Sequence, residues 1–230
     1  MSSGGFLEAL LTFWSRIEIA LPAFRRGLWL TLWVSLLSMA LGLAIGVVVG
    51  ALRTRRLPII HQLTSFYIEL IRNTPLFVQL LYFQFALPAA LGFTPERFSN
   101  GVLALGIRSG AYVAEIVRGG IQAVPAGQMQ AARSLGLSYL QSLRYVVLPQ
   151  AALSILPALG GEFISLVLGS SLVSAIGVLE LTGQARLVVA RTYRNFEVYT
   201  ALAVIYFVLC YPLSLVVQAL ERRLGKGTLR

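Results

Sequence analysis

Residues 28–52 read LWLTLWVSLLSMALGLAIGVVVGAL, a run of 25 residues without a charged side chain. About 20 apolar residues are enough to cross the hydrocarbon of a bilayer. Inside lipid every backbone polar group must find its partner within the protein, so a spanning segment is either a helix or a strand of a closed barrel. The run lacks the strict apolar–polar alternation of a strand. It therefore predicts a transmembrane helix.

Four further stretches are long and apolar enough to predict additional spans. They cover about 59–87, 101–121, 146–181 and 198–220. Pro75 interrupts the first of them, and a kink or break is expected there because proline has no amide hydrogen and clashes with the preceding turn. Together these stretches predict an all-α membrane protein with about five transmembrane helices.

Residues 1–22 are expected to form an N-terminal interfacial segment. Their apolar side chains are interspersed with charges such as Glu8 and Glu18, as is typical of an amphipathic helix that lies in the membrane interface. Pro22 ends this segment. The remainder, 23–230, has no tandem repeat and no low-complexity linker, so a single transmembrane domain is expected.

The composition excludes several classes of function. Charged residues make up 12% of the 230 residues and hydrophobic residues 57%, whereas soluble domains are roughly a quarter charged. The chain has no aspartate, one histidine (His61) and one cysteine (Cys210). A Ser-His-Asp triad, a disulfide framework and a zinc site of cysteine or histidine are therefore excluded. No metal site is expected.

The formal net charge of +10 indicates membrane orientation rather than binding to nucleic acid, because the basic residues lie mainly in short segments between spans. Three arginines follow the first span at 53–56, and three basic residues follow the last span at 222–226. Lysine and arginine are enriched in cytoplasmic loops. The C-terminus is therefore expected in the cytoplasm and the N-terminus outside, although Arg25 and Arg26 count against this orientation.

The segment at about 124–145 is too polar to span a membrane, and within it residues 128–137 read QMQAARSLGL. Helix formers come first, and Gly136 followed by the apolar Leu137 is typical of a helix C-cap. On these features alone the segment is either an ordinary surface helix or a functional one.

This segment resembles the EAA loop of the permease subunits of bacterial ATP-binding-cassette importers. The pattern of that loop is E-A-A, three residues, G and, about nine residues later, I-x-L-P. Residues 131–132, 136 and 148–149 match it, whereas Gln130 replaces the glutamate and Val146 the isoleucine.

Three more stretches are similar to the polar amino-acid branch of the same family. They read ELIRNTPL at 69–76, AYVAEIVRGG at 111–120 and SLVSAIG at 171–177. The four matches follow one another in order between residues 69 and 177. The resemblance implies a type I importer-like permease fold with a cytoplasmic coupling helix, in a multi-pass protein of the bacterial inner membrane.

In that family the coupling helix seats in a groove on a cytosolic ATPase subunit. The resemblance implies that the coupling residues of this chain are Gln128, Gln130, Ala131, Ala132, Arg133, Leu135 and Gly136. The chain contains no G-x-x-x-x-G-K-S or G-x-x-x-x-G-K-T motif for a nucleotide, so ATP and Mg²⁺ are expected on the separate ATPase and no cofactor on this chain. The other implied partners are a second permease subunit in a homodimer or a heterodimer, an extracytoplasmic binding protein, an amino-acid substrate and membrane lipid.

Ionisable residues at bilayer depth need a reason, because each costs at least about 2.5 kcal/mol on insertion scales. Glu162 lies 11 residues after Ala151, roughly 16 Å along a helix, near the middle of the fourth predicted span. Its carboxylate is expected to face either a substrate or a buried partner. Related permeases place substrate contacts in this stretch, which implies substrate-binding roles for Glu162, Ser165, Ser170 and Ser171.

The residues before Pro75 are the other candidates for the substrate pathway: Arg72, Asn73 and Thr74. The spacing of Glu69 and Arg72 makes an ion pair on one helix face the alternative for the arginine. The remaining charges of the third predicted span are expected to pack or to extend toward the interface; they are Arg108, Glu115 and Arg118. Leu168 and Gly169 stand where relatives that carry charged amino acids often have a Lys-Asp pair, so the resemblance does not imply their specificity for charged substrates. A neutral polar amino acid, an acidic amino acid and a heterodimer whose other subunit supplies the missing groups are all open.

Two other functions are open from the sequence. An ion-gradient-driven secondary transporter or channel would use Glu162 to carry protons, but such folds usually show inverted repeats, and none is evident. A membrane enzyme has little material to work with, because no nucleophile is evidently paired with a base. ATP dependence of uptake separates the first alternative from an importer.

Overall fold

The computed structural model describes residue 18 and residues 20–53 and 58–225, and the regular secondary-structure elements within these residues are all helices joined by short turns. Residues 1–17 and 19 of the expected interfacial segment, and residues 54–56 of the arginine cluster, lie outside the described residues. Leu21 and Pro22 are described and already belong to the first long helix. The helices that run along the long axis of the molecule are α2 (Leu21–Arg53), α3 (Pro58–Arg72), α6 (Arg97–Ala123), α9 (Leu148–Gly169) and α11 (Asn195–Gly225).

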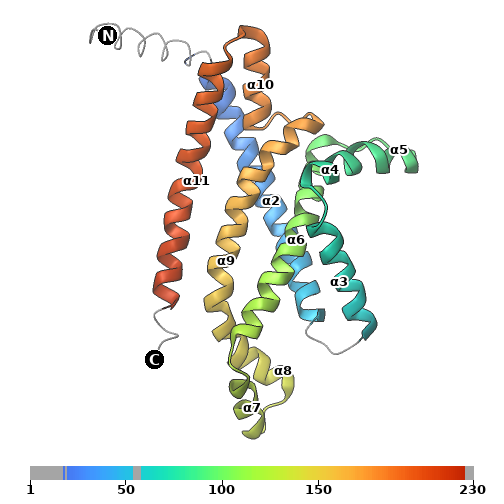
Figure 1. Cartoon of the computed structure of the whole chain (residues 1–230), viewed down its shortest axis with the longest axis vertical. Helices are drawn as coiled ribbons and strands as arrows, with labels where there is room; N and C mark the ends of the chain where they lie inside the picture. Colours follow the sequence, from blue (N-terminus) through green and yellow to red (C-terminus); the bar gives the residue numbers. More distant parts are fainter. Residues whose placement is uncertain (1–17, 19, 54–57, 226–230) are drawn as a thin grey trace.

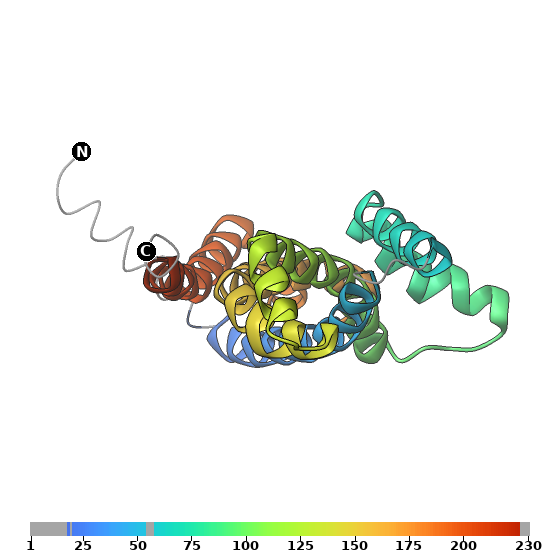
Figure 2. The ribbon, with the colours of Figure 1, turned by 90° about the horizontal axis from the view of Figure 1, so that it is seen from below.

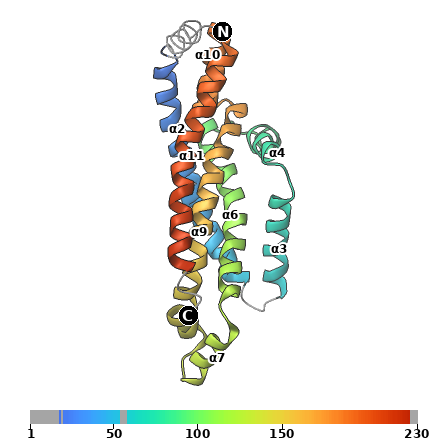
Figure 3. The ribbon, with the colours of Figure 1, turned by 60° about the vertical axis from the view of Figure 1, so that its left-hand side comes forward.

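Successive long helices run in opposite directions (Figures 1 and 3). The start of α2 and helix α10 (Leu181–Thr192) lie at one end of the bundle, called here the α10 end. Helices α7 (Ala126–Ser134) and α8 (Tyr139–Ser142) lie at the opposite end, called the α7 end. Viewed along the axis, α2, α6, α9 and α11 lie close together and α3 stands to one side (Figure 2).

Three helical stretches are long and apolar enough to cross a membrane by themselves: Leu21–Arg53, Tyr139–Ile176 and Asn195–Leu224. The bent pair of α3 with the helices that follow it brings the number up to four. The charged residues of α6 make it more polar than these stretches, yet it lies among them and its core face is buried. The predicted count of about five spans therefore requires α6, which length and composition alone do not establish as a span.

The expected break at Pro75 is confirmed. Helix α3 ends at Arg72, and the chain bends by 102° into α4 (Leu76–Leu81), η1 (Tyr82–Ala86) and α5 (Leu87–Leu91). These three elements lie across the bundle axis (Figure 1). The side-chain nitrogen of the buried Gln79 donates to the carbonyl of Ile71 at 2.7 Å and to that of Thr74 at 3.1 Å. Gln79 thus satisfies the carbonyl of Ile71 in the last turn of α3, which no helical amide can reach.

A stripe of glycines allows α2 to lie very close to α6. Gly42, Gly46 and Gly50 recur every fourth residue, so they share one face of α2. A Cβ added at Gly46 would lie 2.5 Å from the Cβ of Val113, and one at Gly42 would lie 2.6 Å from the side chain of Ser109. Small residues at such spacing hold membrane helices together because they let the backbones approach.

A buried glutamate joins the three elements at the α10 end. Glu180 is fully buried and caps α10, since its carboxylate accepts the backbone amides of Thr182 at 2.8 Å and Gly183 at 2.9 Å. The hydroxyl of Tyr206 on α11 donates to the same carboxylate at 3.2 Å, and that of Thr31 on α2 donates at 3.4 Å. The carboxylate therefore fixes the start of α10 against both neighbouring helices.

The fourth predicted span, at about 146–181, differs from the structure at both ends. The helical stretch begins at Tyr139, so part of the segment expected to lie outside the membrane is continuous with the span through η2 (Leu143–Val147). The α-helix ends at Gly169 and continues as the 3-10 helix η3 (Ser170–Ile176). The second change occurs at Gly169, a residue type that permits close packing or local unwinding, whereas the apolar run contained no signal for η2.

Candidate functional sites

The buried charge of Glu162 is paired with Arg108. A guanidinium nitrogen of Arg108 on α6 lies 3.4 Å from the carboxylate of Glu162 on α9, and the two side chains are 17% and 6% exposed. A buried carboxylate needs a partner of this kind because the interior solvates an isolated charge poorly. Of the two roles expected for Glu162, contact with a buried partner is therefore the one found in this conformation. Arg108, expected only to pack or snorkel, is the partner that the sequence did not reveal.

Tyr112 connects this pair to the break after α3. Its ring lies 4.4 Å from the guanidinium carbon of Arg108 and 5.4 Å from that of Arg72, within the range of cation–π attraction. Arg72 also lies 3.8 Å from Glu115. The alternative pairing of Arg72 with Glu69 is wrong, because the arginine faces α6 instead.

Three guanidinium groups converge on the single carboxylate of Glu115. Arg118, one turn further along α6, lies 2.7 Å from it, and Arg53 at the end of α2 is also paired with it. With Arg72 from α3, this cluster ties α2, α3 and α6 together toward the α7 end. Glu115 thus makes contacts to two other helices, whereas Arg118 pairs with it within α6.

The hydroxyl groups predicted to bind substrate donate hydrogen bonds to backbone carbonyls about one turn earlier in the chain. Ser170 donates to the carbonyl of Val167, and Ser171 donates to that of Leu168, each at 2.7 Å. Thr74 likewise donates to a carbonyl one turn earlier, at 2.9 Å. In this conformation the hydroxyl oxygens can still accept hydrogen bonds from a ligand, but they cannot donate one, because their protons are already engaged. Among the remaining candidates, Ser165 is half-buried and Arg72, Asn73 and Thr74 are exposed.

The fold brings the break after α3 beside the end of α9. A Cβ added at Gly169 would lie 3.4 Å from the side chain of Leu76, so the first turn of α4 lies against the junction of α9 and η3. Two stretches that are far apart in the sequence, 72–74 and 170–171, therefore belong to one region of the molecule. Glu162 connects to that region through Arg108 and Tyr112.

The predicted coupling segment forms α7 and ends as its sequence predicts. Gly136 has φ of +87°, a conformation that favours glycine. The amide of Leu137 donates to the carbonyl of Ala132 at 3.3 Å, and that of Gly136 donates to the carbonyl of Arg133 at 3.1 Å. This pair of bonds is a Schellman C-cap.

Six of the seven predicted coupling residues are exposed at the α7 end: Gln128, Gln130, Ala131, Arg133, Leu135 and Gly136. Ala132 differs, because it is buried within this chain. Leu135 is 84% exposed, which is unusual for a leucine in a polar segment. The side-chain nitrogen of Gln150 on α9 donates to Oε1 of Gln128 at 3.3 Å. Helix α7 is therefore connected directly to the helix that carries Glu162.

Comparison with known proteins identifies the family of this chain. Residues 42–226 match the family described as binding-protein-dependent transport system inner membrane component. The chain belongs to this family. It is a permease component of a transport system and a multi-pass protein of the inner membrane.

The relatives cover most of the chain. A glutamine transport system permease protein of Escherichia coli is 40% identical over 212 residues, which span 92% of this chain and 97% of that protein. A probable glutamine ABC transporter permease protein of Bacillus subtilis is 44% identical over 161 residues, or 70% of this chain and 74% of that one.

Solved structures support the same fold. The family member aligns with a chain of an amino acid ABC transporter crystallised with histidines, with a TM-score of 0.87 and 44% identity over 92% of this chain and 98% of that one. A chain of an inward-facing methionine ABC transporter aligns with a TM-score of 0.75 at 23% identity, covering 88% and 96% of the two chains. The predicted type I importer permease fold is confirmed.

Proposed function

We propose that this permease is the translocation subunit of an ATP-driven amino-acid importer, with a neutral polar amino acid such as glutamine as the first substrate to test. The names of the relatives and of the solved transporter support this substrate class. The leucine and glycine at 168–169, in place of a Lys-Asp pair, favour a side chain without charge.

The buried pair of Arg108 and Glu162 is the observation that carries the proposal. An amino acid is a zwitterion, so its carboxylate can replace Glu162 on the arginine while its ammonium replaces Arg108 on the glutamate. Both buried charges then stay compensated, which avoids the cost of leaving one of them alone. Tyr112 supplies a face for an ammonium or an apolar stem.

The remaining substrate contacts are proposed around this pair. Ser165 lies one turn after Glu162 on the same helix face. The hydroxyl groups of Ser170 and Ser171 present acceptors near the end of α9, and Arg72, Asn73 and Thr74 border the same region at the break after α3. Substrate would enter from the α10 end, where an extracytoplasmic binding protein delivers it.

Coupling to ATP hydrolysis is assigned to α7. Its exposed residues would seat in a groove of a cytosolic ATPase subunit that holds ATP and Mg²⁺, which places the α7 end and the C-terminus in the cytoplasm. Residues 23–230 would act as one domain beside a second permease subunit. ATP-driven closure of the ATPase pair would move the two α7 helices, and their different contacts in the two states would shift the permease between outward and inward conformations.

Reconstitution tests this function. Proteoliposomes that contain the permease with its ATPase, supplied with ATP on the ATPase side and with the binding protein on the other, are expected to accumulate radiolabelled glutamine. Uptake without ATP in response to a proton or sodium gradient would contradict the proposal and favour a secondary transporter. Glutamate or arginine carried faster than glutamine would correct the substrate class alone.

A further inference from the structure

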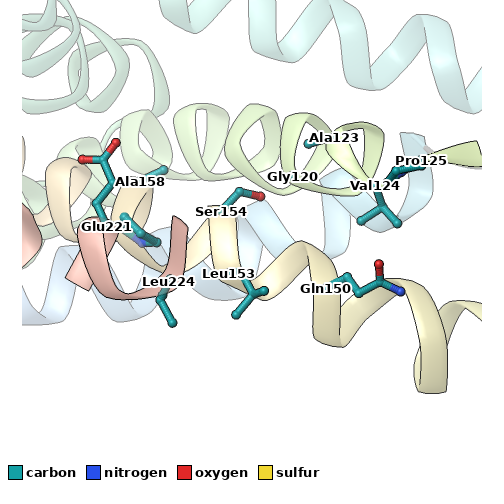
Figure 4. A pocket seen from close by; sticks show the side chains of 11 residues that line it. Gly120, Ala123, Val124, Pro125, Gln150, Leu153, Ser154, Ala158, Glu221 and Leu224 are labelled. Carbon is teal, nitrogen blue, oxygen red and sulfur yellow. The ribbon is translucent and has the colours of Figure 1, made fainter. Parts of the chain in front are cut away.

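A cavity of about 500 Å³ lies at the α7 end, between the last turns of α6, the first turns of α9 and the end of α11 (Figure 4). Its volume falls within the range of small-molecule sites, roughly 300–1,000 Å³. Glu221 and Gln150 lie at opposite ends of it, with Ser154 between them. None of the residues proposed to bind the substrate lines this cavity, so it is a second site.

The polar groups of the cavity wall are hydrogen-bond acceptors. Glu221 carries a negative charge and has no ion pair within the described ranges. The hydroxyl of Ser154 donates its hydrogen bond to the carbonyl of Ala151 at 3.0 Å, so its oxygen can act only as an acceptor for a ligand. The amide nitrogen of Gln150 donates to Gln128 and, at 2.9 Å, to Val146, which leaves its oxygen as an acceptor.

The backbone adds one more acceptor. Pro157 lies inside α9 and also lines the cavity. Since proline has no amide hydrogen, the carbonyl of Leu153, four residues earlier, loses its usual helical donor. Leu153 is itself a lining residue. A wall with acceptors and one negative charge calls for a ligand that donates hydrogen bonds and carries a positive charge.

Most of the remaining wall is apolar. The side chains of Val124, Leu153 and Leu224 come from the connection after α6, from α9 and from α11. The cavity lies at the α7 end, which the proposed coupling role of α7 puts on the cytoplasmic side. From this arrangement we infer that the cavity binds a small cytosolic compound with a primary ammonium group on an apolar body.

The location gives this site a regulatory consequence, which rests on the proposed function of α7. Val124 and Pro125 form the short connection between α6 and α7, and both line the cavity. Gln150, at the same wall, holds Gln128 of α7. A bound ligand would hold this connection in one geometry, so it would change how readily α7 follows the ATPase.

Binding is tested with n-hexylammonium as the probe and hexan-1-ol as its uncharged analogue. The permease–ATPase complex in phosphatidylcholine nanodiscs is titrated by saturation-transfer NMR. Hexylammonium is expected to bind saturably and at least ten-fold more tightly than hexanol. Glu221→Gln should weaken the ammonium at least ten-fold, whereas Glu197→Gln, the same change at the other end of α11, should leave it unchanged. Leu153→Trp, which narrows the cavity without removing the charge, should weaken binding at least ten-fold.

Each contrary result overturns the inference. Equal binding of hexanol, or unchanged affinity in Glu221→Gln or Leu153→Trp, removes the cavity as an ammonium site. Loss of binding in phosphatidylethanolamine nanodiscs would assign the cavity to a lipid headgroup instead. Binding that appears only after the ATPase is removed would make the cavity a subunit contact. None of these readouts requires transport, so the site and the proposed import activity fail independently.

The regulatory consequence has its own readout. Saturating hexylammonium is expected to change the ATPase rate of the reconstituted complex at least two-fold, and the Leu153→Trp complex should need at least ten-fold more hexylammonium for the same change. Binding without any change in rate would overturn the regulatory role.

Discussion

Arg108 and Glu162 are 54 residues apart in the sequence, yet their side chains form an ion pair with the carboxylate only 6% exposed. The pair joins α6 to α9 in the part of the bundle where water is scarce. The pair therefore has two roles. It holds the two helices together, and it supplies the two charges that we propose bind the substrate.

A matched set of variants separates these two roles. Arg108→Gln or Glu162→Gln leaves one buried charge alone, and each is expected to cost about 3 kcal/mol of stability. The double variant removes both charges and should recover most of that loss. It should not recover glutamine uptake, because no charge is left for the zwitterion. Thermal unfolding in detergent measures the first effect, and proteoliposome uptake measures the second. Uptake at the native rate by the double variant would leave the pair with a structural role only.

A second prediction concerns the end of α7. Gly136 adopts φ of +87°, which is unfavourable for any other residue except, to a lesser degree, asparagine and aspartate. A Gly136→Asp change also puts a charge on the exposed surface that we assign to the ATPase. The variant is expected to insert into membranes normally but to copurify at least ten-fold less ATPase. Gly127→Asp, at the start of the same helix, is the control for added charge. Normal recovery of the ATPase with Gly136→Asp would contradict the coupling role.

The sequence predicted the helices well because apolar run length is a local property. The run at 28–52, the break at Pro75 and the C-cap at Gly136 each depend on residues that are neighbours in the chain. The partner of Glu162 could not be predicted in this way, because which charges meet depends on how helices pack. Arg72 shows the same limit: local spacing favoured Glu69, but the arginine faces α6 and pairs with Glu115.

Helix packing also explains why Glu180 was missed. Its position at the end of an apolar run gives no sign that Thr31 and Tyr206 converge on it from two other helices. The close contact of α2 with α6, in contrast, has a sequence signal in the spacing of its glycines.

Two glutamates that cap helices provide a third prediction. Glu96 caps α6 and accepts the amides of Phe98 and Ser99, at 2.9 and 2.6 Å, on an exposed surface. Hydrogen bonds from Ser99 and Phe98 lower the pKa of this carboxyl from its usual value. Glu180 makes the same kind of cap but is fully buried. Glu96→Ala is expected to cost about 1 kcal/mol and Glu180→Ala about 3 kcal/mol, because the latter strands buried donors. Thermal unfolding compares them, and equal losses would mean that burial adds nothing to the cap.

The glycine stripe of α2 gives the last prediction. Gly46→Ala would place a methyl group 2.5 Å from the Cβ of Val113, closer than two carbons can lie, so α2 and α6 must separate. Overpacking of this kind costs about 1–3 kcal/mol. Gly119→Ala in α6 is the matched control, because no described atom outside its own helix lies within 4 Å of the added methyl group. There the change should stabilise the helix by up to about 1 kcal/mol, since alanine has the higher helix propensity. Unfolding temperatures of the purified variants test this difference in sign, and a stabilising Gly46→Ala would show that the contact between α2 and α6 is looser than the structure has it.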